Sequence, residues 1–163
     1  GGQRVVMRPR RGRCGACRAT HVLLPVTVLL RRADAAVVIG AALVAKAAGA
    51  GHRRIAARLD RPSATVRGWL RAFARAAEAI RAYFAVVLVG LAADPVLPQA
   101  SGDVSADVVA VIAAVADAAG RRWPQMGTVS PWLVASAATA GCLIHPSGPA
   151  MWIKTSHPWA GWM

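Results

Sequence analysis

Two cysteines and a group of arginines are the side chains whose types and spacing point to chemistry. Cys14 and Cys17 form a Cys-x-x-Cys pair with Gly15 between them. Two thiolates at this spacing on a tight turn form one knuckle of a zinc ribbon, and a closed structural zinc site needs four ligands. His21 is a candidate third ligand, whereas Cys142 is far away in the sequence. The pair fits half a metal site, a redox pair or chance, and its strand-like flanks favour half a ribbon.

The arginines gather around one interrupted helical pattern. The stretch GHRRIAARLDRPSATVRGWLRAF contains six of them and a proline. It fits a helix-turn-helix, with the small residue Ala56 on the first helix and Asp60 at the turn, because Asp tolerates a left-handed backbone better than most residues. Val66, followed by Trp69 or Leu70, provides the inner face of the second helix. We therefore predict two short helices crossing at a steep angle.

The outer face of that second helix would meet base edges in the major groove of DNA. The predicted base-contacting residues are Ser63, Ala64, Arg67, Gly68 and Arg71. Two of them are arginines one helical turn apart, and arginine can pair bidentately with guanine. The predicted phosphate-contacting residues, which would set register without reading sequence, are Arg53, Arg54, Arg58, Arg61 and Arg75. The alternative is a helical hairpin with a solvated basic face.

The charge of the chain is strongly segregated. The net charge is +13 over 163 residues. Residues 1–81 hold 17 Lys+Arg and 3 Asp+Glu, a net charge of +14, and residues 82–163 hold 3 and 4, a net charge of −1. Solubility alone would not require this segregation, which instead indicates a polyanion-binding half and a neutral half.

Four regions are expected along the chain. Short strands are predicted for residues 1–32, where Arg, Gly and β-branched residues alternate in places. Helices are predicted for about 33–50, His52 to Leu59, and onward from Ser63 as a possible N-cap. The proposed divisions are 1–32 (partial zinc-ribbon-like β segment), 33–93 (helix-turn-helix domain with extended third helix), 94–144 (C-terminal helices) and 145–163 (Trp/Pro-rich tail). The fold class is thus mainly α, preceded by a short, incomplete zinc-ribbon-like β-hairpin.

The third helix carries a long apolar seam with heptad spacing. Its members are Val66, Leu70, Phe73, Ala77, Ile80, Phe84, Val87 and Leu91. One element expected to cover this seam is a fourth helix, roughly Ser105 to Ala119, folded back antiparallel. Its Val108, Ile112 and Val115 would then contact the seam. The other is a second copy of the chain in a homodimer. A fifth short helix should begin at Ser130 and Pro131, a good cap and first-turn pair.

Several segments also resemble a known family. They are RPRRGRC-x-x-C, THVLLP, RRADA, GHRRIAARL and TVRGWLRAF, with KTSHPW near the end. Over about residues 4–84 the chain resembles an actinobacterial family of unknown function, whose members join an N-terminal zinc ribbon to a helix-turn-helix and resemble the N-terminal regions of transposases. The family's ribbon carries an earlier cysteine pair that this chain lacks. The resemblance implies zinc in a longer chain, with the first knuckle upstream of Gly1, and we expect no tightly held zinc here.

Other functions have less support in the sequence. A transposase or integrase active site needs three carboxylates converging on metal ions, but the seven acids are scattered, and Asp103 and Asp107 open a helix, where carboxylates are favoured. We expect no enzymatic activity. The longest apolar run, AVVLVGLAA, is far short of the ~20 residues of a membrane span, and no secretory signal is visible, so we expect a cytoplasmic, nucleoid-associated protein with no membrane partner.

The predicted function is sequence-specific binding of double-stranded DNA, as a transcriptional regulator or a transposition-related protein. The alternative is a helical interaction or assembly protein whose basic half is a non-specific nucleic-acid anchor. Salt dependence and competitor DNA distinguish the two, because a specific binder keeps a preferred site at salt that removes non-specific binding.

Overall fold

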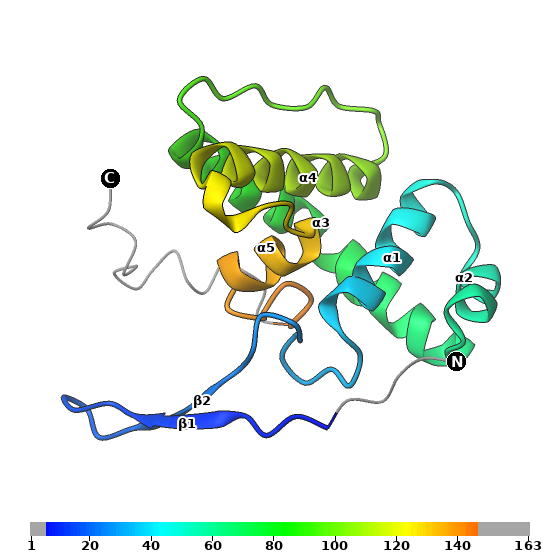
Figure 1. Cartoon of the computed structure of the whole chain (residues 1–163). Helices are drawn as coiled ribbons and strands as arrows, with labels where there is room; N and C mark the ends of the chain where they lie inside the picture. The colour runs from blue at the N-terminus through cyan, green and yellow to red at the C-terminus, as the bar shows by residue number, and fades with distance from the viewer. Residues whose placement is uncertain (1–5, 147–163) are drawn as a thin grey trace.

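The computed structural model describes residues 6–146, and these form a helical bundle with a projecting β-hairpin (Figure 1). The elements are β1 Arg10–Arg13, β2 Thr20–Leu23, α1 Ala36–Ala47, α2 His52–Leu59, α3 Ser63–Leu91, α4 Val104–Arg122, the 3₁₀ helix η1 Pro124–Met126 and α5 Pro131–Ala138. The predicted fold class, mainly helical with a short N-terminal hairpin, is confirmed. Most of the expected tail region, from residue 147 on, lies outside the described residues.

α3 is the long central helix, and its buried face follows most of the predicted seam. Five of the eight seam residues are buried: Val66, Phe73, Ala77, Ile80 and Phe84. The other three are partly buried, and Trp69, Tyr83 and Leu88 are buried in addition. This difference is expected because a straight α-helix has 3.6 residues per turn, so a strict heptad stripe drifts around it by about 20° per heptad.

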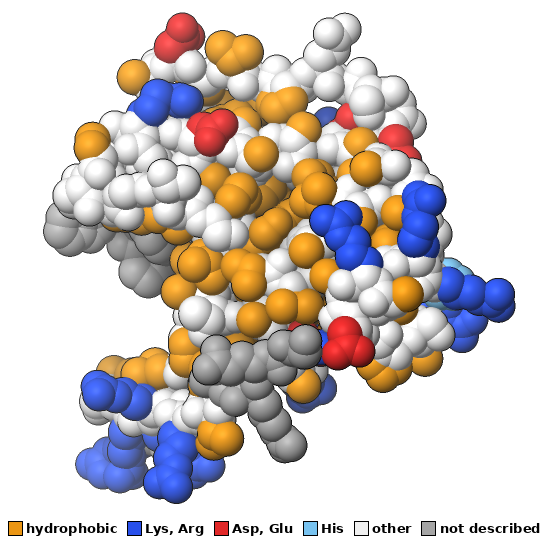
Figure 2. Space-filling model, turned by 45° about the vertical axis from the view of Figure 1, so that its right-hand side comes forward, with side chains coloured by type: hydrophobic (Ala, Val, Ile, Leu, Met, Phe, Trp, Pro, Cys, Tyr) orange, Lys and Arg blue, Asp and Glu red, His pale blue; other side chains and the backbone are white. Residues whose placement is uncertain are grey.

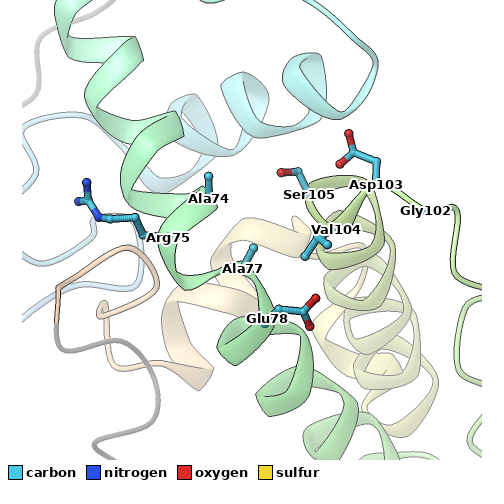
Figure 3. Close-up of a pocket in the computed structure, with 8 residues that line it drawn as sticks. All are labelled: Ala74, Arg75, Ala77, Glu78, Gly102, Asp103, Val104 and Ser105. Atoms are coloured by element: carbon cyan, nitrogen blue, oxygen red, sulfur yellow. The ribbon is translucent and has the colours of Figure 1, made fainter.

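α3 packs most extensively against α4, and the two helices run parallel (Figures 1 and 3). The start of α4, at Val104 and Ser105, lies beside Ala74 and Glu78 of α3. One to two turns further on, Asp107 and Val111 lie in the same surface hollow as Arg81 and Ala85. The predicted cover of the seam by α4 is therefore confirmed, but the expected antiparallel direction was wrong.

The connection between α3 and α4 explains the parallel arrangement. Residues 92–103 run back along the helix pair (Figure 1), so that Leu97, Pro98 and Ala100 lie beside Arg81. From Leu91 back to the level of Arg75 an α-helix covers about 24 Å, which a segment of this length spans in extended form. A tight antiparallel turn needs only about 2–8 residues. The length of the segment was compatible with both arrangements.

The face of α4 that meets α3 is the predicted one. Val108 and Ile112 are fully buried, and Val115 is 1% exposed. Asp103 caps the helix by accepting a hydrogen bond from the backbone N–H of Ala106 at 3.0 Å. These local signals set the start of the helix and its buried face, which is why both could be read from the sequence.

α5 joins the C-terminal helices to α1. It starts as predicted, with Ser130 accepting from the N–H of Trp132 and Pro131 in the first turn. The Trp132 ring lies directly on the backbone of Gly40, where an added Cβ would be 2.1 Å from ring carbons. Only glycine permits this approach, and it brings the first and last helices of the bundle together. The hydroxyl of Tyr83 donates a hydrogen bond to the carbonyl of Ala138, which fixes α5 to α3 as well.

The hairpin is antiparallel and leaves the bundle at its base (Figure 1). Its register pairs Arg11 with Val22 and Gly12 with His21. After β2 the chain returns to the bundle, where Val28 and Leu29 are buried in contact with the helices. The strands themselves remain largely outside the core.

Among residues 6–146, no helix combines the length and apolar character required to cross a bilayer.

Candidate nucleic-acid interface

The turn between α2 and α3 has the backbone geometry that the sequence predicts. α2 ends at Leu59, and Asp60 adopts the left-handed conformation, with φ 53° and ψ 54°. The N–H groups of Asp60 and Arg61 donate to the carbonyls of Ala57 and Ala56 and so satisfy the end of α2. A left-handed residue at this position lets the chain reverse within a few residues. α3 then begins immediately after Pro62.

One detail at the start of α3 differs from the prediction. Ser63 is the first residue of the helix, and Pro62 occupies the cap position without a side-chain hydrogen bond. Ser63 therefore does not act as the N-cap. Because Pro62 has a fixed φ close to that of a helix and lacks an N–H, it can precede the first turn directly, so the serine hydroxyl is left exposed.

The inner face of the helix pair is closely packed. Ala56 is 3% exposed and Val66 is fully buried. Of the two candidates for the next inner position, Trp69 is buried and Leu70 only partly so. Ile55 is buried against them, and Leu59 is partly buried. The small side chain of Ala56 permits the close approach of α2 and α3 that a helix-turn-helix requires.

The predicted base-contacting residues share one exposed surface. All five are exposed at the start of α3: Ser63, Ala64, Arg67, Gly68 and Arg71. Within residues 6–146, no hydrogen bond or ion pair engages the guanidinium of Arg67 or Arg71. Apart from the backbone of its own helical turns and its chain neighbours, no described atom lies within 4 Å of where a Cβ on Gly68 would be. We call this set the α3 outer face, and its arginines are available to a ligand.

The predicted phosphate-contacting residues divide into two groups. Arg53, Arg54 and Arg58 are exposed on α2, and Arg75 is exposed on α3, where its side chain points away from α4 (Figure 3). Arg61 differs, because its Nε lies 2.6 Å from Oδ1 of Asp34 and another of its nitrogens donates to the carbonyl of Asp60. Arg61 thus ties the turn to the segment before α1, while the other four guanidiniums face solvent.

The cysteine pair occupies the turn of the hairpin. The Cys14 N–H donates to the carbonyl of Ala19, and the Arg18 N–H donates to the carbonyl of Cys14. The backbone N–H of Cys17, with its thiol and the N–H of Ala16, hydrogen-bonds the Cys14 sulfur and lowers the pKa of that thiol. Amides directed at a cysteine sulfur favour the thiolate, which is the metal-binding and nucleophilic form.

A complete metal site is not assembled in the part of the chain that the structure describes. Residues 6–146 bring together no group of three or more His, Cys, Asp or Glu side chains able to hold a metal ion. His21 lies on β2 opposite Gly12, outside any such group. Cys142 is buried after α5 and also lies outside any such group. The hairpin therefore contributes only the Cys14–Cys17 pair, which is one knuckle of a zinc ribbon.

The acidic residues that could suggest catalysis have structural roles. Asp103 caps α4, and Asp107 accepts hydrogen bonds from both the backbone N–H and the hydroxyl of Ser101, each at 2.7 Å. These bonds, with a smaller contribution from the charge of Arg81, hold the pKa of Asp107 below its ordinary value. The nearby open hollow, about 450 Å³, has Glu78 and Asp103 at its edges and alanines on its floor (Figure 3).

The arginines of the hairpin are the residues whose role the sequence analysis left open. The charge segregation placed them in the polyanion-binding half, but no contact was predicted for the five arginines in or beside the two strands: Arg8, Arg10, Arg11, Arg13 and Arg18. All five are exposed. The run of arginines is visible in the sequence RPRRGR, but the sequence did not indicate that the hairpin projects from the bundle.

A scan against protein-family models finds no match to this chain, and searches of curated proteins and of solved structures find no similar protein.

Proposed function

We propose that this protein binds double-stranded DNA sequence-specifically through α2 and the start of α3, as a transcriptional regulator or a transposition-related protein. The observation that carries the proposal is the α3 outer face: Arg67 and Arg71 stand one turn apart after a left-handed turn, exposed and with no polar partner among residues 6–146. A helix so placed fits the major groove of B-DNA, where arginine can contact guanine O6 and N7 together.

The surrounding charge supports the same function. Arg53, Arg54 and Arg58 flank the α3 outer face from α2, where phosphate contacts would position the helix in the groove. Gly68, with open space around it, permits close approach of the helix backbone to DNA. A protein of this kind would act at the nucleoid.

The test begins with selection of a preferred site from random duplexes, followed by fluorescence anisotropy on that site and on base-substituted versions. Arg67→Ala and Arg71→Ala should each weaken the binding free energy for the selected site by ~1–3 kcal/mol and relax the preference at one base position. Arg53→Ala and Arg58→Ala should weaken binding to all duplexes about equally. Arg121→Ala is the matched control, because Arg121 is equally exposed but lies at the end of α4.

A second candidate function is protein assembly with a non-specific basic anchor. It is favoured by the exposed apolar residues near the end of α3 and in the following segment, namely Val86, Val89, Val96 and Leu97. If wild type shows no preferred site and competitor DNA abolishes all binding, the assembly function is the better account. If Arg67→Ala retains both affinity and base preference, the assignment of α3 as the base-contacting helix is wrong.

A homodimer would place two α3 outer faces on one duplex, with half-sites about one helical turn or a multiple of it apart. The buried face of α3 is already covered by α4 within one chain, so that face is not available to a second copy. Sedimentation at micromolar concentration is expected to give a monomer near 16.9 kDa. A stable dimer would point to a contact outside this face.

For the cysteine knuckle we expect no zinc to be retained by this chain after chelation and dialysis, because two thiolates leave the coordination open. Elemental analysis measures the stoichiometry. One tightly held zinc ion per chain would require further ligands, from His21 or from a second molecule.

A further inference from the structure

The β-hairpin is a second basic surface, separate from the helix-turn-helix. Within residues 6–146, none of its five exposed arginines forms an ion pair, and the first acid in the sequence is Asp34. Among the described residues, the one hydrogen bond from any of the five guanidiniums runs from Nε of Arg13 to the carbonyl of Arg18, at 3.3 Å. Three of the five lie on β1 itself and the other two lie just before it and in the turn, so positive charge is concentrated in one short segment. Such an arrangement is stabilised when a polyanion binds.

The hairpin has little support from the bundle. Val22 and Leu23 are each 55% exposed although they lie within β2, so neither face of the ribbon is packed into the core. The register places Arg11 and Arg13 on one face, with Val22 and Thr20, and Arg10 on the other with His21. An isolated two-stranded hairpin is marginally stable in water at best, so a ribbon of this kind gains from contact with a ligand.

The base of the hairpin is nevertheless fixed. The Leu30 N–H donates to the carbonyl of Gly141 at 2.8 Å, and the buried hydroxyl of Ser136 donates to the carbonyl of Val28 at 3.1 Å. The Ala36 N–H donates to the carbonyl of Thr27 at 2.8 Å, just before α1. The ribbon therefore projects from an anchored point at a defined place relative to the helices.

The two basic surfaces lie on the same side of the molecule. In Figure 1 the hairpin and the start of α3 both lie on the side away from α4. Figure 2 shows Lys and Arg side chains gathered on the hairpin at the lower left and over the helices at the right, with largely apolar surface between them. A ligand that engages both must be long and carry negative charge at intervals.

We propose that the hairpin is a second DNA-contacting arm, which binds the phosphates of the duplex flanking the site contacted by the α3 outer face. This inference rests on the proposed function. Duplex DNA fits better than single-stranded nucleic acid or a membrane surface, because the sequence has no Phe, Trp or Tyr before Trp69. Single-strand binding relies on aromatic side chains on which bases stack. Interfacial anchoring requires a continuous apolar face, but Val22 and Leu23 lie on opposite faces of the ribbon, whereas phosphate contacts need only positive charge.

The experiment compares two double variants that remove the same charge from two different elements, the hairpin and the end of α4. Arg11→Gln/Arg13→Gln removes two arginines from one face of the ribbon, and Arg121→Gln/Arg122→Gln removes two from the end of α4. Each protein is titrated with the selected site in a minimal duplex and in one extended by about ten base pairs, one helical turn, on each side. The titrations are repeated over a range of salt concentrations.

Wild type should bind the extended duplex more tightly than the minimal one. The hairpin variant should lose that advantage, with affinity for the extended duplex falling on the order of tenfold and the salt slope by about 2, while base preference is unchanged. The α4 variant should behave as wild type. Arg11→Lys/Arg13→Lys should keep the length dependence, because it keeps the charge, and this variant also controls for loss of the hairpin fold.

Each other outcome has a definite meaning. Equal length dependence and salt slope in the hairpin and α4 variants would overturn the arm while leaving the helix-turn-helix intact. Equal binding of duplex RNA of the same length would overturn the assignment to DNA. If Arg67→Ala loses base preference but keeps its length dependence, the two surfaces act separately as proposed. Absence of wild-type binding to any duplex would overturn both the arm and the proposed function.

Discussion

The two halves of α3 belong to one continuous helix but meet different surroundings. From Ser63 to Arg75 the helix packs its inner face against α1 and α2 and exposes three arginines on its outer side. From Tyr83 to Leu91 it has no charged residue and packs against α4 and the end of α5. The first half leaves its outer face free of structural contacts, while the second half contributes mainly to the core. Mutations along this single helix can therefore separate stability from the proposed DNA binding.

The largest expected effect is in the second half. Phe84 is fully buried, so Phe84→Ala should lower the free energy of unfolding by about 3–5 kcal/mol. Arg71→Ala, on the outer side of the first half, should change it by no more than about 0.5 kcal/mol. Urea denaturation followed by circular dichroism measures both. Val86→Ala is the control on the same half, since Val86 is 71% exposed. A large loss of stability in Arg71→Ala would show that the outer side of the first half contributes to the stability of the fold.

A second contrast compares two glycines in helices. Gly40→Ala should cost about 1–3 kcal/mol or more, because its Cβ would overlap the ring of Trp132. Gly68→Ala meets nothing within 4 Å and should stabilise the protein by up to about 1 kcal/mol. Thermal unfolding should show a lower Tm for Gly40→Ala and an unchanged or higher Tm for Gly68→Ala. Adding Trp132→Leu to Gly40→Ala should recover part of the lost stability. If the double variant is no more stable than Gly40→Ala, the overlap with the Trp132 ring is not the cause of the loss.

A third contrast compares arginines around the turn. Arg61→Ala breaks the ion pair with Asp34 and should cost about 0.5–1 kcal/mol, a modest value because both side chains are partly exposed. Arg67→Ala should leave the free energy of unfolding unchanged within measurement. A double-mutant cycle of Arg61→Ala with Asp34→Ala isolates the coupling between the two side chains. A coupling of zero would return Arg61 to the group of arginines that are free to contact phosphate.

The smallest effect concerns the start of α4. Because the pKa of Asp107 is lowered by its bonds to Ser101, its stabilising contribution is present above the ordinary aspartate pKa of about 3.9 and is lost as the pH falls through the lowered value. Asp107→Asn should therefore make unfolding slightly less sensitive to pH below about 4. Chemical denaturation at several acidic pH values compares this variant with wild type. Ser101→Ala should give a change of the same sign, and an opposite sign would contradict the assignment.

Local sequence signals predicted much of this molecule. The bounds of α2, the left-handed Asp60 and the capped start of α5 each depend on a few neighbouring residues, and all three predictions are confirmed. The buried face of α3 was predicted where heptad spacing and 3.6-residue periodicity agree, and it was missed at Tyr83 and Leu88, where they diverge. These features are encoded within one or two helical turns.

The remaining features depend on residues far apart in the sequence. The parallel direction of α4 follows from the path of residues 92–103, which apolar periodicity does not define. The ion pair of Arg61 joins it to Asp34, 27 positions earlier, so composition alone placed this arginine with the free ones. The projection of the hairpin likewise follows from how Val28 and Leu29 dock between helices.

The parallel run of α3 and α4 also shapes the electric field of the molecule. Aligned peptide dipoles give each helix a partial positive charge at its start and a partial negative charge at its end. In an antiparallel pair these fields largely cancel, whereas here both positive ends point toward the side that carries α2 and the arginines of early α3 (Figure 1). The backbone thus adds to the side-chain charge instead of opposing it. A molecule polarised in this way tends to approach any polyanion with its arginine-rich end first.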